Sequence, residues 1–169
     1  MDCKREHLIG HLRRTLSLHP FWAEKLGHTA AAAFTLHLAI LREPYLRFIL
    51  EGKKTIETRF AKRPCPPFER VAKGDVLLLK RSPGSIVGVC VVEAVWFYRL
   101  DSESLALIKS KFGPAICAAD ASFWEERKEA VVATLMLIAH VARVTPFSVK
   151  KKDRRGWVVI NGVEPPALL

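Results

Sequence analysis

Residues 52–60, Gly-Lys-Lys-Thr-Ile-Glu-Thr-Arg-Phe, carry the pattern from which the fold of this chain is inferred. The stretch joins an apolar helical run to a β-like run and combines a turn glycine with two lysines, an acid and a guanidinium. If its second half forms a strand, the period of two places Thr55, Glu57 and Arg59 on one face, with Lys54 at the mouth of that face. The alternative is a surface strand on which Glu57 and Arg59 only pair with each other, a contact worth about 0–1 kcal/mol.

Neighbouring runs predict the elements on either side of this stretch. Residues 36–41 alternate in a way that predicts a strand. Pro44 suits the first position of a helix and Gly52 suits the left-handed residue just past its end, so a short helix should lie between them. The apolar runs 76–80 and 86–96 are joined by Ser-Pro-Gly-Ser and predict a β-hairpin.

The second half of the chain predicts inserted helices and two further strands. Asp101 should cap a helix that ends near Phe112, before Gly113-Pro114. A second helix is expected over about 121–131. The apolar run 131–144 favours a strand, and Gly156 precedes a last one.

Three single residues also lead to expectations. Gly88 interrupts an apolar run and predicts a bulge or a close backbone approach. His37 is expected at the flank of its strand rather than as a ligand, and His140 as a hydrogen-bonded core histidine.

The motif residues carry a resemblance to a known family. Gly52, Lys54, Glu57 and Arg59 stand in the spacing G-x-K-x-x-E-x-R, which resembles the signature of the ASCH domain, a relative of the PUA-like RNA-binding barrels. The order of the expected elements agrees with that family over about residues 35–160. The resemblance implies an α+β fold: a small PUA-like β-barrel with inserted helices.

The resemblance says nothing about the first thirty residues. Their leucines recur at loosely helical spacing, and their acidic residues argue against a mitochondrial targeting peptide. We expect residues 1–33 to form an N-terminal helical extension or arm, and residues 34–169 to form the ASCH-type domain.

The charge and cysteine content of the chain indicate which binding partners and cofactors to expect. The formal net charge is +10 and the pI is about 9.8, which favours a polyanion. Cys3, Cys65, Cys90 and Cys117 are widely spaced and predict neither a zinc site nor a disulfide framework. We therefore expect no metal and no cofactor, reduced thiols and a cytoplasmic protein. The longest apolar run is too short for a membrane span, and the oligomeric state stays open.

The candidate site residues fall into two groups. Those expected to bind the ligand are Tyr45, Lys54, Thr55, Glu57, Arg59 and Glu93, of which Lys54 and Glu57 are also the candidates for catalysis. Those expected to contact a nucleic-acid backbone are Lys62, Arg63, Lys150, Lys151, Lys152, Arg154 and Arg155.

The favoured function is binding of RNA, a nucleotide or a nucleoside. The common nucleophile, phosphate-loop, zinc-protease and dinucleotide motifs are missing from the sequence. The resemblance implies an enzymatic possibility, a small amidohydrolase acting on N4-acylated cytidine, in which the lysine falls on Lys54; the threonine of those relatives is replaced here by Glu57. The chain could also be a ribonuclease, or a protein-interaction module without a nucleic-acid ligand.

Overall fold

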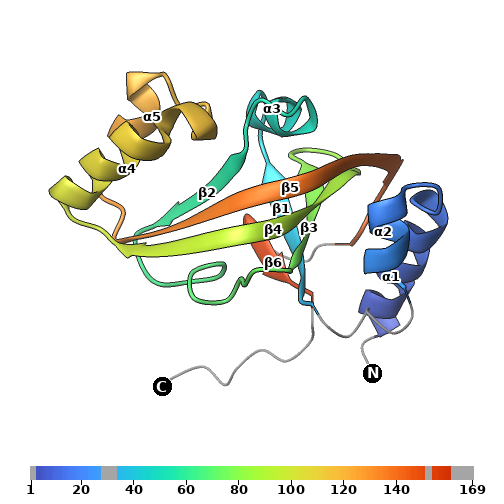
Figure 1. Ribbon diagram of the computed structural model, residues 1–169. Helices are drawn as coiled ribbons and strands as arrows, with labels where there is room; N and C mark the ends of the chain where they lie inside the picture. Colours follow the sequence, from blue (N-terminus) through green and yellow to red (C-terminus); the bar gives the residue numbers. More distant parts are fainter. Residues whose placement is uncertain (1–2, 28–33, 151–153, 161–169) are drawn as a thin grey trace, which may run out of the picture.

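The computed structural model describes residues 3–27, 34–150 and 154–160, whose strands form one curled six-stranded sheet in the order β2-β5-β4-β3-β1-β6 (Figure 1). The strands are β1 Leu36–Leu41, β2 Ile56–Ala61, β3 Val76–Arg81, β4 Ile86–Arg99, β5 Val132–Phe147 and β6 Trp157–Val159. β1 and β3 pair in parallel, and every other pair is antiparallel. The sheet is a half-barrel, and we call its open side, between β2 and the β1–β6 pair, the seam.

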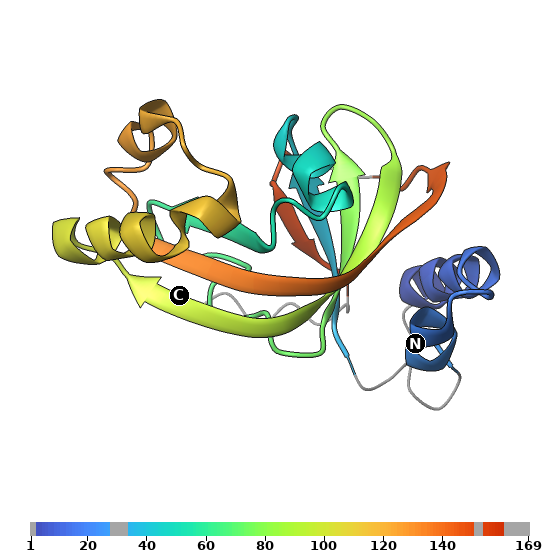
Figure 2. The ribbon, with the colours of Figure 1, turned by 45° about the horizontal axis from the view of Figure 1, so that its top comes forward.

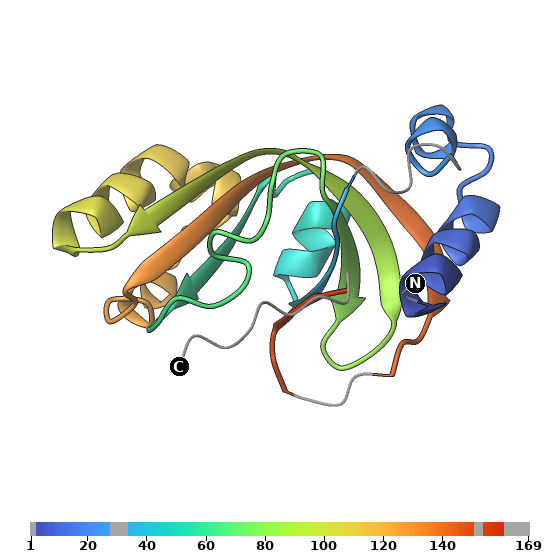
Figure 3. The ribbon, with the colours of Figure 1, turned by 90° about the horizontal axis from the view of Figure 1, so that it is seen from below.

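Four of the described helices lie at the two ends of this sheet, and a fifth lies over its middle (Figure 1). The described helices are α1 Cys3–Thr15, α2 Pro20–Lys25, α3 Tyr45–Leu50, α4 Ser102–Ile116 and α5 Ala121–Glu125. Figure 2 shows β4 and β5 as a long curved pair that runs from α4 and α5 at one end to α1 and α2 at the other. α3 lies over the middle of the curve, next to the start of β2 (Figures 1 and 3). The β1, α3, hairpin and β5 assignments confirm the sequence predictions.

The N-terminal helices pack into the same core as the strands. Leu8, Ile9 and Leu12 are fully or almost fully buried and belong to a cluster that includes residues of β1, β3 and β4. The indole of Trp22 is also buried, and its Nε1 donates a hydrogen bond of 2.9 Å to the His140 carbonyl in β5. Of the two expected forms of this segment, helix and arm, the packed helix is observed.

Two helix ends differ from the prediction. α4 continues through Gly113-Pro114 to Ile116 and ends at Cys117, which has φ 61°. Its last turn buries Gly113 and Ile116, so packing outweighs the hydrogen bond that a proline removes. α5 ends at Glu125 instead of near residue 131, because Val131 already donates to a sheet carbonyl, that of Ala61.

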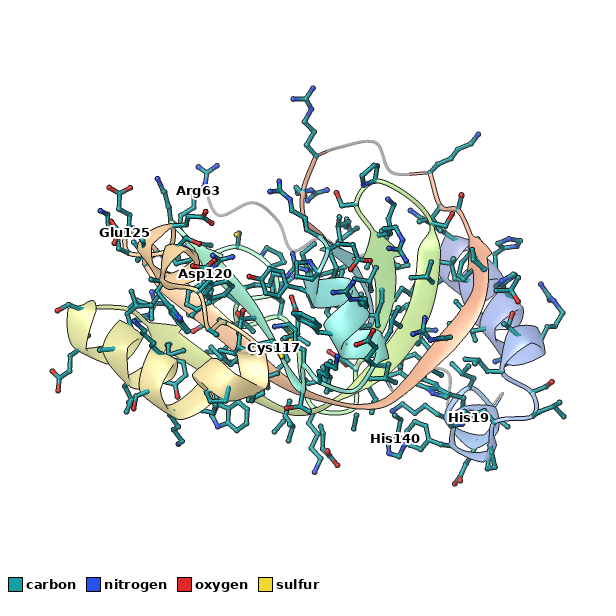
Figure 4. All side chains as sticks on the ribbon, turned by 90° about the horizontal axis from the view of Figure 1, so that it is seen from above. His19, Arg63, Cys117, Asp120, Glu125 and His140 are labelled. Atoms are coloured by element: carbon teal, nitrogen blue, oxygen red, sulfur yellow. The ribbon has the colours of Figure 1, made fainter. Side chains whose placement is uncertain are left out.

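The expectation of a core position for His140 was wrong. A register shift between β4 and β5 leaves an extra residue on β5, and His140 takes φ 51° there. Its side chain is exposed and stacks on Phe21 of α2, with ring centroids 3.6 Å apart. Figure 4 places it with His19 at the N-terminal end of the molecule, away from Cys117 and Asp120.

Gly88 and His37 show what the two other single residues do. The register shifts beside Gly88, and a Cβ there would lie 2.8 Å from Leu50 Cδ2, so both a bulge and a close approach are confirmed. His37 is completely buried, with its Nε2 3.0 Å from Asp75 Oδ2 and its Nδ1 3.1 Å from Trp157 Nε1. Because an indole N–H only donates, Nδ1 accepts, and the three side chains tie β1, β3 and β6 together.

Candidate functional site

Arg59 spans the seam of the half-barrel. It extends from the edge strand β2 and donates through Nη2 to the carbonyl of Ile40 in β1, at 2.9 Å. Its Nη1 donates at 3.1 Å to the carbonyl of Gly156, just before β6. The guanidinium also lies 5.2 Å from the ring centroid of Trp157, the residue held by His37. The two ends of the sheet are therefore joined by one side chain.

Lys54 and Glu57 form a buried pair beside Arg59. Only 3% of Lys54 and 4% of Glu57 are exposed. Lys54 Nζ donates to the carbonyls of Ile56, at 2.8 Å, and Ile116, at 3.0 Å, and lies 3.6 Å from Glu57 Oε2. Two backbone carbonyls accept hydrogen bonds from the ammonium, and the Glu57 carboxylate is its ion-pair partner. The lysine thus connects the start of β2 to the end of α4.

The carboxylate of Glu57 is held between two cations by charge rather than by hydrogen bonds. The contact to Lys54 is longer than a hydrogen bond. Arg59 Nε lies 3.2 Å from Oε1, yet the angle leaves this buried N–H without a hydrogen-bond partner. Glu57 therefore keeps open acceptor capacity on an almost completely buried carboxylate.

Burial shifts the titration of two cations at this site. Desolvation lowers the pKa of Lys54 from its ordinary value, and the neighbouring Glu57 carboxylate opposes that change. Desolvation also lowers the pKa of Arg127, and the nearby carboxylates of Glu126 and Glu57 oppose that change.

Lys54, Glu57 and Arg59 open onto one cavity of about 1010 Å³. Seven cationic and four acidic side chains line it. The cations are Arg42, Lys54, Arg59, Lys80, Arg127, Arg154 and Arg155, and the acids are Glu43, Glu57, Asp120 and Glu126. All four acids have local partners: Glu43 pairs with Arg81, Asp120 caps α5, Glu126 pairs with Arg127, and Glu57 lies between Lys54 and Arg59.

One wall of the cavity is aromatic. Tyr45, Phe60 and Phe123 all line it, and the ring of Phe123 lies 5.9 Å from Tyr45 and 6.2 Å from Phe60, centroid to centroid. The guanidinium of Arg127 lies 3.5 Å from the Phe123 centroid. Rings and a stacked guanidinium are the surfaces on which unpaired bases stack. The cavity is also lined by Arg42, just after β1, Lys80 in β3 and Arg154 before β6, which we call the cationic wall.

The ASCH domain family matches residues 40–166, which is most of the chain. The chain belongs to the ASCH domain family. Three similar solved structures are crystal structures of the ASCH protein of Zymomonas mobilis. A serine-to-alanine variant has a TM-score of 0.57 and 16% identity, covering 73% of this chain and 87% of that one. A tyrosine-to-phenylalanine variant has a TM-score of 0.53 and 19% identity, covering 68% of this chain and 76% of that one. The unmodified protein has a TM-score of 0.51 and 18% identity, covering 68% of this chain and 73% of that one.

At these identities, the similarity to the three crystal structures shows a shared fold. The mixed α and β architecture with a curled half-barrel sheet is the one expected from the sequence motif. No curated protein matches the sequence significantly.

The cavity of about 1010 Å³, which we call the cleft, is lined by four of the six side chains expected to bind the ligand: Tyr45, Lys54, Glu57 and Arg59. Thr55 and Glu93 lie elsewhere. Thr55 is exposed just before β2, where its backbone N–H bonds to Ala115. Glu93 is the extra residue of a bulge in β4, exposed and outside the lining of the cleft. The expectation that Glu93 binds the ligand assumed an unbroken strand.

Of the basic residues expected to contact a nucleic-acid backbone, some line the cleft and others lie outside it. Arg154 and Arg155 line the cleft. Lys62 is exposed outside it and pairs with Glu129 at 3.1 Å. Arg63 is likewise exposed outside the cleft, and Figure 4 shows it pointing away from the body of the molecule. Lys150 is exposed, and Lys151 and Lys152 lie outside the described residues.

Several cleft residues were missed from the sequence. Phe123 and Arg127 belong to the insertion between β4 and β5, more than sixty residues after the motif, and no spacing rule connects the two segments. Arg42 and Lys80 follow apolar strand runs, which is a weak signal. Basic residues at the ends of neighbouring parallel strands could have been grouped, because those ends meet at one edge.

Neither a metal-ligating cluster nor a membrane-spanning helix occurs in the described part of the chain. No group of three or more His, Cys, Asp or Glu side chains there could hold a metal ion. No helix in that part has the length and apolar character needed to cross a membrane.

Proposed function

We propose that this ASCH domain binds single-stranded RNA or a nucleotide in the cleft at the seam. The observation that carries the proposal is the combination, in one cavity, of an aromatic wall, a cationic wall and a buried carboxylate between them. Rings and Arg127 offer stacking surfaces for a base, whereas Arg42, Lys80 and Arg154 offer charge to phosphate. A nucleotide has these two chemically different ends.

The charge balance supports the same ligand class. Cationic side chains outnumber acidic ones in the cleft, and each of the four acids already has a neighbouring partner. The net charge of +10 over the whole chain adds attraction for a polyanion. Membership of a family that resembles the PUA-like RNA-binding barrels is consistent with this proposal.

The geometry favours binding over hydrolysis of an N4-acylated cytidine. A lysine that acts as a base needs a free lone pair, but Lys54 donates to backbone carbonyls of β2 and α4 and its ammonium pairs with Glu57. Thr55, whose hydroxyl could donate a hydrogen bond to a reacting group, is exposed outside the cleft. Glu57 is then best explained as a group that accepts hydrogen bonds from a bound ligand.

The test is fluorescence anisotropy with a labelled single-stranded oligoribonucleotide at several salt concentrations. We expect binding whose affinity falls with salt, with a log–log slope that grows by about 0.7 for each phosphate contact. A flat salt response, or no binding at low salt, would overturn the proposal. Incubation with N4-acetylcytidine tests the hydrolase directly, and we expect no release of acetate.

A further inference from the structure

Glu57 is an unusual group to find at the floor of a cleft for a polyanion. Its carboxylate is almost completely buried, lines the cavity and lacks a well-formed hydrogen bond to either neighbouring cation. A buried charge without hydrogen bonds is costly, so a ligand that supplies donors here is favoured strongly over one that does not.

The charge state of Glu57 determines which ligand groups it accepts. With Lys54 on one side and Arg59 on the other, the side chain is a carboxylate, and a carboxylate only accepts hydrogen bonds. Its two oxygens can accept two adjacent donors at once. Phosphate and the carbonyl edges of a base would instead be repelled.

The four bases of RNA present different edges to such a group. Guanine presents two adjacent donors, the ring N1–H and the 2-amino group. Cytosine and adenine each present one amino group beside a ring acceptor, and uracil presents one N–H between two carbonyls. Only guanine offers two adjacent donors to the two oxygens of a carboxylate.

From this match we infer that Glu57 makes the cleft selective for guanine, by accepting from its N1–H and 2-amino group while the base stacks against the aromatic wall. The inference rests on the proposed function and adds the base to it. Tyr45 and Phe123 supply the wall beside Glu57, and Lys54 lies 5.6 Å from the Tyr45 centroid, so ring and carboxylate belong to one subsite.

The experiment compares labelled hexauridylates that carry one central guanosine, inosine, adenosine or cytidine with unsubstituted hexauridylate. Inosine is the matched probe, because it keeps N1–H and lacks only the 2-amino group. We expect the guanosine oligomer to bind at least about tenfold more tightly than the uridine and adenosine oligomers, and inosine to fall between them. These comparisons use the unmodified protein and do not depend on the folding of a variant.

Two variants assign the preference to Glu57. Glu57→Gln should reduce the guanosine preference to less than about threefold, because an amide turns one acceptor into a donor. Glu103→Gln removes the same charge from an exposed position on α4 and should leave the preference unchanged.

The outcomes separate this inference from the proposed function. Equal binding of all five oligomers, or a guanosine preference that persists in a folded Glu57→Gln protein, would overturn the inference and leave RNA binding standing. Failure of every oligomer to bind would overturn both.

Discussion

Arg59 of β2 donates a hydrogen bond of 2.9 Å to the carbonyl of Ile40 in β1, although three strands separate β2 from β1 in the sheet. The contact exists because the sheet curls until its ends approach each other. It places the residues of the sequence motif beside the chain before β6, and the cleft forms along this seam.

Replacing Arg59 by lysine should therefore loosen the seam. A lysine carries the charge but cannot donate in a fixed fork to the Ile40 and Gly156 carbonyls. We expect the free energy of unfolding to fall by about 1–3 kcal/mol in urea denaturation. The matched control is Arg99→Lys, at an exposed position whose ion pair is 3.9 Å long, with a change below about 0.5 kcal/mol. Equal stability of the two variants would contradict the bridging role.

Lys54 should give the protein a distinctive pH dependence. Because burial lowers its pKa in the folded state, the unfolded chain binds more protons between that lowered value and the ordinary 10.5. The free energy of unfolding should rise with pH across this window, by at most about 1.4 kcal/mol per pH unit.

The measurement is the difference in unfolding free energy between the unmodified protein and Lys54→Met, followed as the pH increases toward 10.5. This difference should shift in favour of the unmodified protein, whereas the same comparison with Lys109→Met, an exposed lysine on α4, should stay flat. A shift in the opposite direction would show that the ammonium is stabilised, not penalised, by burial.

The N-terminal helices should be required for stability. Leu12 is completely buried in the core shared with the sheet, and Leu12→Ala should cost about 2–5 kcal/mol. Leu18 lies in the same segment but is 96% exposed, so Leu18→Ala should cost less than about 0.5 kcal/mol. Thermal or urea unfolding of the two variants measures the contrast, and similar small losses would mean that the segment is dispensable.

Phosphate contact can be tested at the cationic wall. Arg154→Gln should reduce the log–log salt slope of RNA binding by about 0.7, because Arg154 lines the cleft. Lys62→Gln should leave the slope unchanged, because Lys62 is exposed outside the cleft and pairs with Glu129. Equal effects of the two changes would place the backbone path elsewhere.

Local patterns were enough to predict much of this molecule. The bracketing of α3 by Pro44 and Gly52 and the shared face of Glu57 and Arg59 follow from neighbouring residues, and both are observed. The family motif correctly indicated the half-barrel.

The remaining features depend on contacts between distant segments. Lys54 donates a hydrogen bond to a carbonyl sixty-two residues away, that of Ile116, and this contact favours a structural cation over the candidate base. α4 passes through Gly113-Pro114 because its last turn is buried, and Glu93 leaves the cleft because of a bulge. None of these contacts leaves a periodic signal in the sequence.

The most direct test of the central claim is an NMR titration of the ¹⁵N-labelled protein with a single-stranded oligoribonucleotide. We expect chemical-shift changes concentrated at the backbone amides of Tyr45, Glu57, Phe123 and Arg154, on four separate segments that meet only in the cleft, with those of α1 unchanged. Changes confined to α1 or to the loop that carries Lys62, or no changes at low salt, would contradict the assignment of this cleft as the binding site.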